Sequence, residues 1–93
     1  MVKPPPLTVA SPPPRPLLLY DGSCRFCTLW IQRLRRHTGD FVDYVPSQSS
    51  DGAARFPEIP RDDFDHAVQL ILPDGRVFHA AEAVCRALAN HPE

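Results

Sequence analysis

The stretch that decides the fold is Leu17–Cys27, which reads LLLYDGSCRFC. Its four opening apolar residues are ended by an Asp-Gly pair, a pattern typical of a fully buried strand followed by a turn. Ser23 then occupies the expected N-cap of a helix, because its hydroxyl can accept a hydrogen bond from a free amide of the first turn. The stretch therefore predicts a strand, a tight turn and a helix whose first turn carries Cys24 and Cys27.

The helix is expected to run from Cys24 to His37, before a natural stop at Gly39. Arginines and a histidine gather in its last turn, where cations suit the helix dipole. Apolar side chains recur at helical spacing along one face, and its aromatic members are interpreted as core or rim residues rather than as a ligand site. This face consists of Phe26, Trp30 and Leu34, with Cys27 and Ile31 beside them.

The rest of the chain predicts three more strands and one more long helix. The expected strands are 41–45, 67–72 and 76–79, with a short helical link after the first and a Pro-Asp-Gly turn between the last two. The last helix is expected over 80–90. Its inward face consists of Ala83, Val84, Ala87 and Leu88, and Cys85 is interpreted as an inert core thiol on that face.

The order β-α-β followed by β-β-α defines the fold class. A right-handed β-α-β crossover makes the first two strands parallel, and the hairpin adds antiparallel strands. This order predicts an α/β fold with a four-stranded mixed sheet and flanking helices, a minimal thioredoxin-like core. Residues 16–93 are assigned to this domain. The proline-rich residues 1–15 are expected to form a disordered leader, with a proline-motif docking site as the alternative.

Composition narrows the class of function. Ten basic and 11 acidic side chains give a net charge of −1, and no basic stripe indicates nucleic-acid binding. No apolar run is long enough for a membrane span, and no apolar segment after Lys3 resembles a secretory signal. Three cysteines leave one thiol unpaired, unlike the even pattern of a secreted disulfide scaffold, so a cytoplasmic location is expected.

The pair Cys24 and Cys27 predicts thiol-disulfide exchange. A thiolate is the reactive form of cysteine, and a helix N-terminus stabilises it, with Arg25 as an added cation. Cys24 is expected to attack a substrate disulfide, and Cys27 to resolve the mixed disulfide. Two alternatives stay open. One is half of a zinc site, which would have to recruit Cys85 and a histidine without a suitable spacing, and the other is two small core residues.

The same stretch resembles the D-G-x-C-x-x-C signature of the DCC family of predicted thiol-disulfide oxidoreductases. The match consists of Asp21, Gly22, Cys24 and Cys27, with a looser likeness at Val45, Pro46 and 68–88. The resemblance implies a thioredoxin-like fold and a thiol-disulfide exchange activity, and it names no substrate.

The aspartate for which that family is named is Asp21 in this chain. Its carboxylate could accept the proton of the resolving thiol or orient the loop amides, or it could only fix the bend as an Asx turn. An anion near Cys24 opposes thiolate formation, so Asp21 is not expected to lower the pKa of that thiol. Gly22 is interpreted as a position that needs a backbone angle other residues resist.

One departure from thioredoxins concerns the residue before the third strand. Thioredoxins carry a cis-proline there, facing the cysteines and helping to bind substrate, whereas this chain has Ala67. His66 precedes it and could contact the disulfide or donate a proton, since its ordinary pKa is near neutrality, or it could be a plain loop residue.

These features together predict an enzyme, a thiol-disulfide oxidoreductase that uses no cofactor and no metal. Its expected partner is a disulfide- or thiol-bearing protein or a small thiol, and neither nucleic-acid binding nor membrane insertion is expected. A non-enzymatic thiol or zinc-binding interaction module is the alternative.

Overall fold

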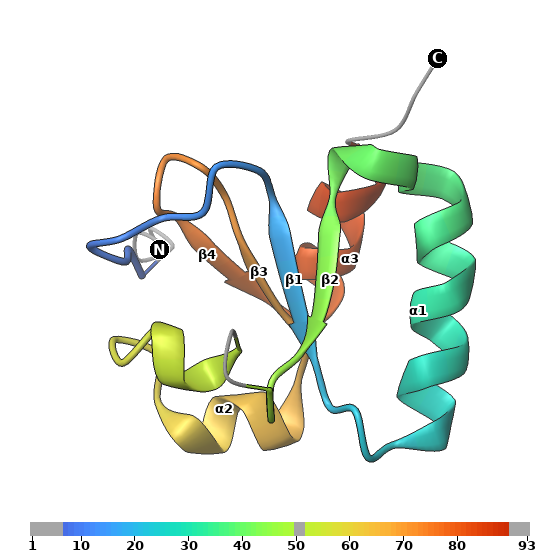
Figure 1. Cartoon of the computed structure of the whole chain (residues 1–93), viewed down its shortest axis with the longest axis horizontal. Helices are drawn as coiled ribbons and strands as arrows, with labels where there is room; N and C mark the ends of the chain where they lie inside the picture. Colours follow the sequence, from blue (N-terminus) through green and yellow to red (C-terminus); the bar gives the residue numbers. More distant parts are fainter. Residues whose placement is uncertain (1–6, 50–51, 90–93) are drawn as a thin grey trace, which may run out of the picture.

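The centre of the molecule is a four-stranded mixed sheet with the spatial order β2-β1-β3-β4 (Figure 1). The computed structural model describes residues 7–49 and 52–89, apart from the side chains of Asp65 and His66. The strands are β1 (Leu17–Tyr20), β2 (Asp43–Pro46), β3 (Gln69–Ile71) and β4 (Val77–His79). β1 is parallel to β2 and antiparallel to β3, and β3 is antiparallel to β4. The predicted α/β class and mixed sheet are confirmed.

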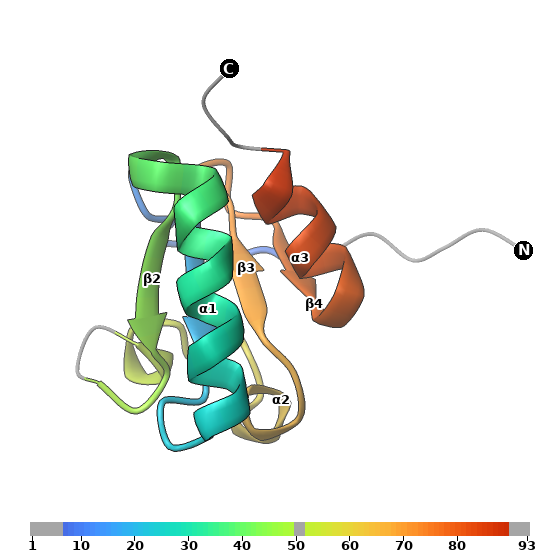
Figure 2. The same cartoon turned by 90° about the vertical axis from the view of Figure 1, so that its right-hand side faces the viewer.

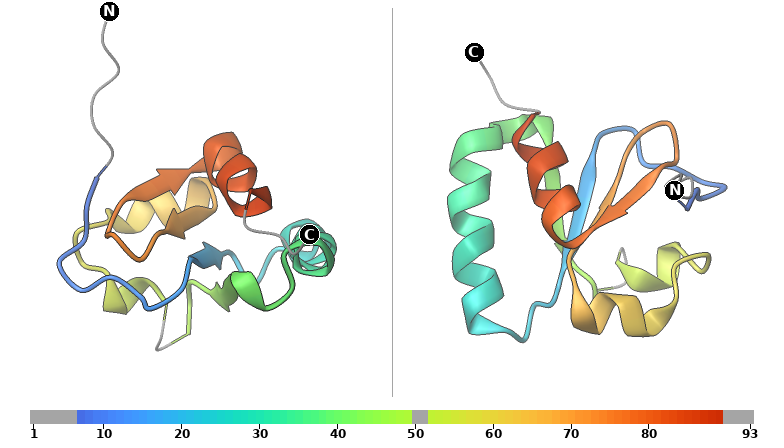
Figure 3. Two further views of the ribbon diagram at one scale, coloured as in Figure 1. Left: turned by 90° about the horizontal axis from the view of Figure 1, so that it is seen from above. Right: turned by 180° about the vertical axis from the view of Figure 1, so that it is seen from behind.

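Two longer helices lie side by side on one face of the sheet (Figure 2), and a shorter helix packs into the core on the other face. The helices are α1 (Arg25–Thr38), α2 (Arg61–His66) and α3 (Ala80–Leu88), with 3-10 turns at Gly39–Phe41 and Ala53–Arg55. The views from above and from behind show α3 beside α1 (Figure 3). None of the described helices has the length and apolar character that a membrane span requires.

The central strand β1 separates two apolar clusters. Leu18 faces α1 and α3, while Leu17 and Leu19 face the opposite cluster, and all three side chains are buried. Successive side chains of a strand point to opposite faces, so a strand that is apolar at every position can be covered on both. This arrangement confirms the prediction of a buried strand before the Asp-Gly turn for the three leucines, while Tyr20 at the end of the strand is half-buried.

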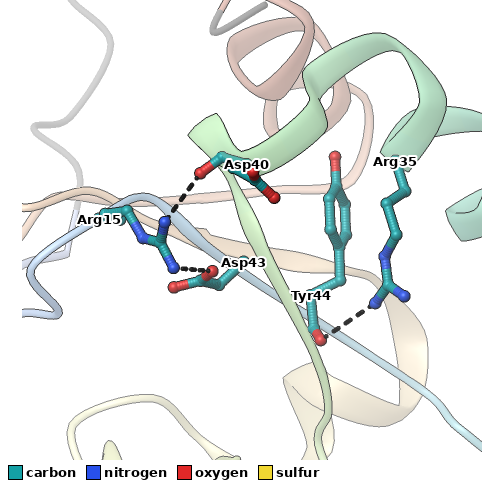
Figure 4. Close-up of polar contacts among 5 residues, drawn as sticks. All are labelled: Arg15, Arg35, Asp40, Asp43 and Tyr44. Carbon is teal, nitrogen blue, oxygen red and sulfur yellow. Dashed lines mark hydrogen bonds and ion pairs between the residues drawn. The ribbon is translucent and has the colours of Figure 1, made fainter.

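The edge strand β2 is fastened by two arginines from outside the sheet (Figure 4). Arg15 Nη2 lies 2.8 Å from Asp43 Oδ1, and Arg15 Nη1 donates a hydrogen bond to the carbonyl oxygen of Asp40. Arg35 reaches from α1 over the ring of Tyr44 and donates to its carbonyl oxygen at 3.5 Å. These contacts join three segments into one unit. The segments are the chain before β1, the strand β2 and the helix α1.

A buried hydroxyl pair fixes the end of α1 against β2. Thr38 is fully buried, and its Oγ1 lies 2.6 Å from the hydroxyl oxygen of Tyr44 and donates to the carbonyl oxygen of Leu34. A 3-10 turn over Gly39–Phe41 follows, so β2 begins at Asp43 and not at residue 41 as predicted. The early start was wrong because the chain is still turning away from the helix at residue 41.

The last helix differs from its predicted orientation. Ala83 and Ala87 are buried and Val84 packs partly against the core, whereas Leu88 and Cys85 are exposed. Each helical residue turns by about 100°, so a helix with Ala83 and Ala87 on its core line turns Cys85 away from that line. The interpretation of Cys85 as an inert core thiol was therefore wrong.

The described part of the proline-rich segment runs beside the β3–β4 hairpin. The amide of Val9 donates to the carbonyl oxygen of Gly75 at 2.9 Å, and the amide of Val77 donates to the carbonyl oxygen of Leu7 at 2.8 Å. Val9 is buried in the cluster of the α2 face. A domain boundary at residue 16 stays a prediction, and residues 1–6 lie outside the described part of the chain.

Candidate active site

A hydrogen-bonded turn joins β1 to α1. One carboxylate oxygen of Asp21, Oδ1, accepts from the Ser23 amide at 3.0 Å, the Ser23 hydroxyl at 2.7 Å and the Gln48 side-chain amide at 2.6 Å. The other end of that amide, Gln48 Oε1, accepts from the Gly22 amide at 3.0 Å. The bond to the residue two positions on makes Asp21 the head of an Asx turn, and Gln48 ties this turn to the segment after β2.

The N-cap of α1 is Cys24, and the predicted cap Ser23 was wrong. Ser23 donates its hydroxyl to Asp21 and so does not cap the helix. Cys24 has extended backbone angles, and its sulfur accepts from the Cys27 amide at 3.2 Å. The thiol therefore occupies the position where free amides and the helix dipole favour a negative charge.

Hydrogen bonding gives the two thiols different pKa values. The Cys27 thiol and amide hydrogen bonds lower the pKa of Cys24 from its ordinary value, against opposition from burial and from the Asp21 charge. The same thiol–thiol hydrogen bond, together with burial, raises the pKa of Cys27 to about 11. Hydrogen bonds to the ionised form favour it, so the negative charge of the pair resides on Cys24.

The Asp21 carboxylate is held in its charged form. Hydrogen bonds from the Ser23 hydroxyl, the Ser23 amide and Gln48 lower the pKa of Asp21. Its charge raises the pKa of both Cys24 and Cys27, which agrees with the expectation that Asp21 does not activate the thiol by its charge. With its three donors in place, the carboxylate orders the turn in front of Cys24.

Glycine is required at position 22 because a side chain there has no room, and not because of a special backbone angle. Among the described residues, positive φ occurs at Gly39, Gly75 and Ala80, and not at Gly22. A Cβ atom at position 22 would lie 2.9 Å from the Cβ of Pro46, the last residue of β2. The predicted reason for this glycine was wrong, because the constraint comes from a residue distant in sequence.

The remaining predicted site residues are Arg25, Ala67 and His66. Arg25 is the exposed first residue of α1. Ala67 ends α2 in extended backbone, with its amide donating to the carbonyl oxygen of Asp63, and none of the described peptide bonds is cis. The side chain of His66 lies outside the described part of the structure. The contribution of these three residues stays a prediction.

An apolar groove opens beside the cysteine pair, between α1 and α3. This α1–α3 groove has a volume of about 400 Å³. It is lined by Phe26, Cys27, Trp30, Ile31, Leu34, Val68, Ala81, Val84 and Cys85. Ile31 and Leu34 reach the core, as predicted, but Phe26 is 69% and Trp30 47% exposed. The sequence signal was present, since these aromatic residues stand one helical turn apart beside Cys27.

No metal centre is formed by the residues that the structure describes. Within 7–49 and 52–89, no group of three or more His, Cys, Asp or Glu side chains is arranged to hold an ion. Structural zinc needs four such ligands. The described geometry therefore gives no support to a zinc site built on the two cysteines.

The sheet order, the flanking helices and a dithiol at a helix N-terminus are compatible with a small thioredoxin-like core. A family model described as DCC1-like thiol-disulfide oxidoreductase matches residues 18–93, and the chain belongs to this family. No curated protein and no solved structure matches the chain. Family membership confirms the resemblance found in the D-G-x-C-x-x-C motif and supports a thiol-disulfide redox role.

Proposed function

We propose that the protein is a thiol-disulfide oxidoreductase in which Cys24 is the nucleophile and Cys27 the resolving thiol. The observation that carries this assignment is the pair of hydrogen bonds that Cys27 directs to the Cys24 sulfur. They lower the pKa of Cys24 and leave Cys27 protonated, with a pKa of about 11. An attacking thiol needs the thiolate form, whereas a resolving thiol can stay protonated until the mixed disulfide has formed.

The exchange balances as a two-electron transfer. The Cys24 thiolate attacks one sulfur of the substrate disulfide, forming a mixed disulfide and releasing the other sulfur as a thiolate, which takes up a proton. Cys27 then loses its proton and attacks the Cys24 sulfur, which releases the second substrate thiol. The protein now holds a Cys24–Cys27 disulfide, the substrate is reduced by two electrons, and an external dithiol must reduce the protein again.

We assign Asp21 a positioning role in this cycle. Its Oδ1 is engaged by Ser23 and Gln48, and its lowered pKa makes it a weak base. It fixes the turn that delivers Cys24 to the helix N-terminus, while Gly22 allows that turn to approach Pro46. Arg25 is the cation nearest in sequence to the attacking thiol.

A reducing direction accompanies the proposed cytoplasmic location. The cytosol keeps protein thiols reduced, so a dithiol protein there passes electrons to disulfides rather than introducing them. The partner is a disulfide-bearing protein or small molecule.

The proposal is tested by insulin reduction in the presence of dithiothreitol. Wild type is compared with Cys24→Ser and Cys27→Ser, all in a Cys85→Ser background so that only the pair supplies thiols. We expect Cys24→Ser to fall to the uncatalysed rate, and Cys27→Ser to accumulate a mixed disulfide visible by mass spectrometry when it is mixed with insulin without dithiothreitol. Equal rates in all three proteins would refute the redox role, and near-stoichiometric zinc in the purified protein would favour a metal-binding module.

A further inference from the structure

The α1–α3 groove is a patch of exposed apolar surface that begins at the redox pair. Its lining contains no charged side chain, and Cys27 forms part of it. Phe26 and Trp30 on its α1 wall stack edge to face with ring centroids 6.3 Å apart, and Leu29 beside them is 60% exposed. Contiguous apolar surface of this kind on a small protein marks a place where another molecule binds.

The helix that forms one wall of this groove carries only positive charge. Its sequence contains no Asp or Glu, and its cationic residues are Arg25, Arg33, Arg35 and Arg36, all exposed. Among the described residues, the ion pairs found join arginines outside α1 to carboxylates, and none involves Arg25, Arg33 or Arg36. A protein of net charge −1 therefore concentrates uncompensated positive charge on the helix that bears the dithiol.

The chemistry of disulfide exchange determines which part of the substrate lies near the groove. The substrate sulfur must bond to Cys24, so the groups attached to that sulfur rest on the surface around the pair. From Cys27 to Leu34 the helix rises about 10 Å, a length that about three extended residues span. A polypeptide can follow this path with the residues next to its cysteine, whereas a small thiol without apolar groups has nothing to place against these side chains.

We propose that the α1–α3 groove docks the substrate, and that the substrate is a protein disulfide with apolar residues next to its cysteine and acidic residues beyond them. The apolar side chains lie against Phe26 and Trp30, and the acidic ones face Arg33, which follows Trp30 by one helical turn. This inference rests on the proposed exchange function for the identity of the ligand as a disulfide. The docking step itself is measurable without exchange.

Trp30 provides the direct readout, because it is the only tryptophan of the chain. The protein used is the full chain with Cys24→Ser and Cys27→Ser, which lacks the redox pair. The probe is a peptide with an alanine in place of the cysteine, leucines on both sides and glutamates outside them. We expect saturable change in Trp30 fluorescence. Replacing the glutamates by lysines should weaken binding about tenfold or more, less so at high salt, and replacing the leucines by serines should also weaken it.

Two variants locate the binding on the protein. Arg33→Glu reverses an exposed charge beside the groove and is expected to lower the affinity for the acidic peptide about tenfold. Arg61→Glu, the matched reversal on α2 of the opposite face, should leave the affinity unchanged. Circular dichroism of each variant checks that the fold is intact. Equal effects of the two reversals would overturn the assignment of the groove.

The reduction rates distinguish the two proposals. Wild-type protein is given the disulfide-linked dimer of the acidic leucine peptide, that of the basic peptide, and hydroxyethyl disulfide. Preference for the acidic dimer, lost in Arg33→Glu while hydroxyethyl disulfide is reduced as before, supports docking. Equal reduction of all three without a Trp30 response overturns docking and leaves the exchange function standing. Saturable peptide binding without reduction of any disulfide refutes the exchange function alone.

Discussion

The two faces of the sheet are covered in different ways. On the α2 face, Phe56, Ile59 and Phe64 are buried and close the core against β1. On the other face, α1 and α3 contact each other but leave the α1–α3 groove open, with aromatic side chains at its edge and the dithiol at its end. The closed face therefore supplies stability, and the open face is the surface that we propose for exchange.

The difference follows from the side chains that each face contributes. The α2 face is built from an irregular segment that turns at Pro57 and Pro60 and inserts large side chains between the turns. The other face has small residues, Ala83 and Ala87, as the buried positions of α3. Small contacts let α3 lie close to the sheet, but they do not fill the space toward α1.

The largest expected effect is on the closed face. Phe56→Ala removes a fully buried ring and should lower the free energy of unfolding by about 3–5 kcal/mol, because it loses apolar burial and leaves a cavity. Urea denaturation measures this change, with Phe56→Leu as a milder control. Trp30→Ala, on the open face, should cost far less because nearly half of that side chain is already exposed. Equal losses would contradict the division between the faces.

A smaller effect is expected where α1 is anchored. Thr38→Val keeps the shape but deprives the buried Tyr44 hydroxyl of its partner, at an expected cost of about 1–3 kcal/mol. Thr38→Ser keeps the hydroxyl and serves as the control. Thermal unfolding compares the two. If Thr38→Val were as stable as Thr38→Ser, the hydroxyl pair would not be what fixes this end of the helix.

Gly22→Ala tests the close approach at the active-site turn. The added methyl group meets the Cβ of Pro46, so we expect a cost of about 1 kcal/mol, at the low end for overpacking because the loop is exposed. The turn should also shift, and Cys24 should then react more slowly with iodoacetamide. An unchanged stability together with an unchanged rate would remove the proposed role of this glycine.

The smallest expected effect concerns Asp21→Asn. The amide oxygen can still accept from the Ser23 amide, but the negative charge that raises the pKa of Cys24 is gone. The pKa of Cys24 should therefore fall further, and alkylation at neutral pH should become a few times faster. Asp21→Ala, which cannot hold the turn, is the contrasting variant. Slower exchange by Asp21→Asn with normal alkylation would instead assign the carboxylate to proton transfer from Cys27.

The sequence predicted those features that depend on local patterns. The apolar run before the Asp-Gly pair specified β1, and the spacing of apolar residues specified α1, because both signals reflect burial of a regular element. The turn at residues 73–75 likewise located the hairpin between β3 and β4. The parallel pairing of β1 with β2 then followed from the helical crossover between them.

The features that were missed depend on competition or on distant contacts. Ser23 is a better cap by residue type, but Asp21 captures its hydroxyl and leaves the position to Cys24. The constraint on Gly22 comes from Pro46, which sequence alone does not place beside it. The exposure of Cys85 depends on how α3 rotates over the sheet, a rotation that the weakly apolar alanines of that helix do not specify.

The most direct test of the roles proposed for Cys24 and Cys27 is the alkylation of each cysteine by iodoacetamide as a function of pH, resolved by peptide mass spectrometry. Cys24 should react first, with a midpoint below the ordinary thiol pKa, and Cys27 should react only as the pH approaches about 11. Cys27 reacting before Cys24, or both with one midpoint at the ordinary value, would contradict the assignment of nucleophile and resolving thiol.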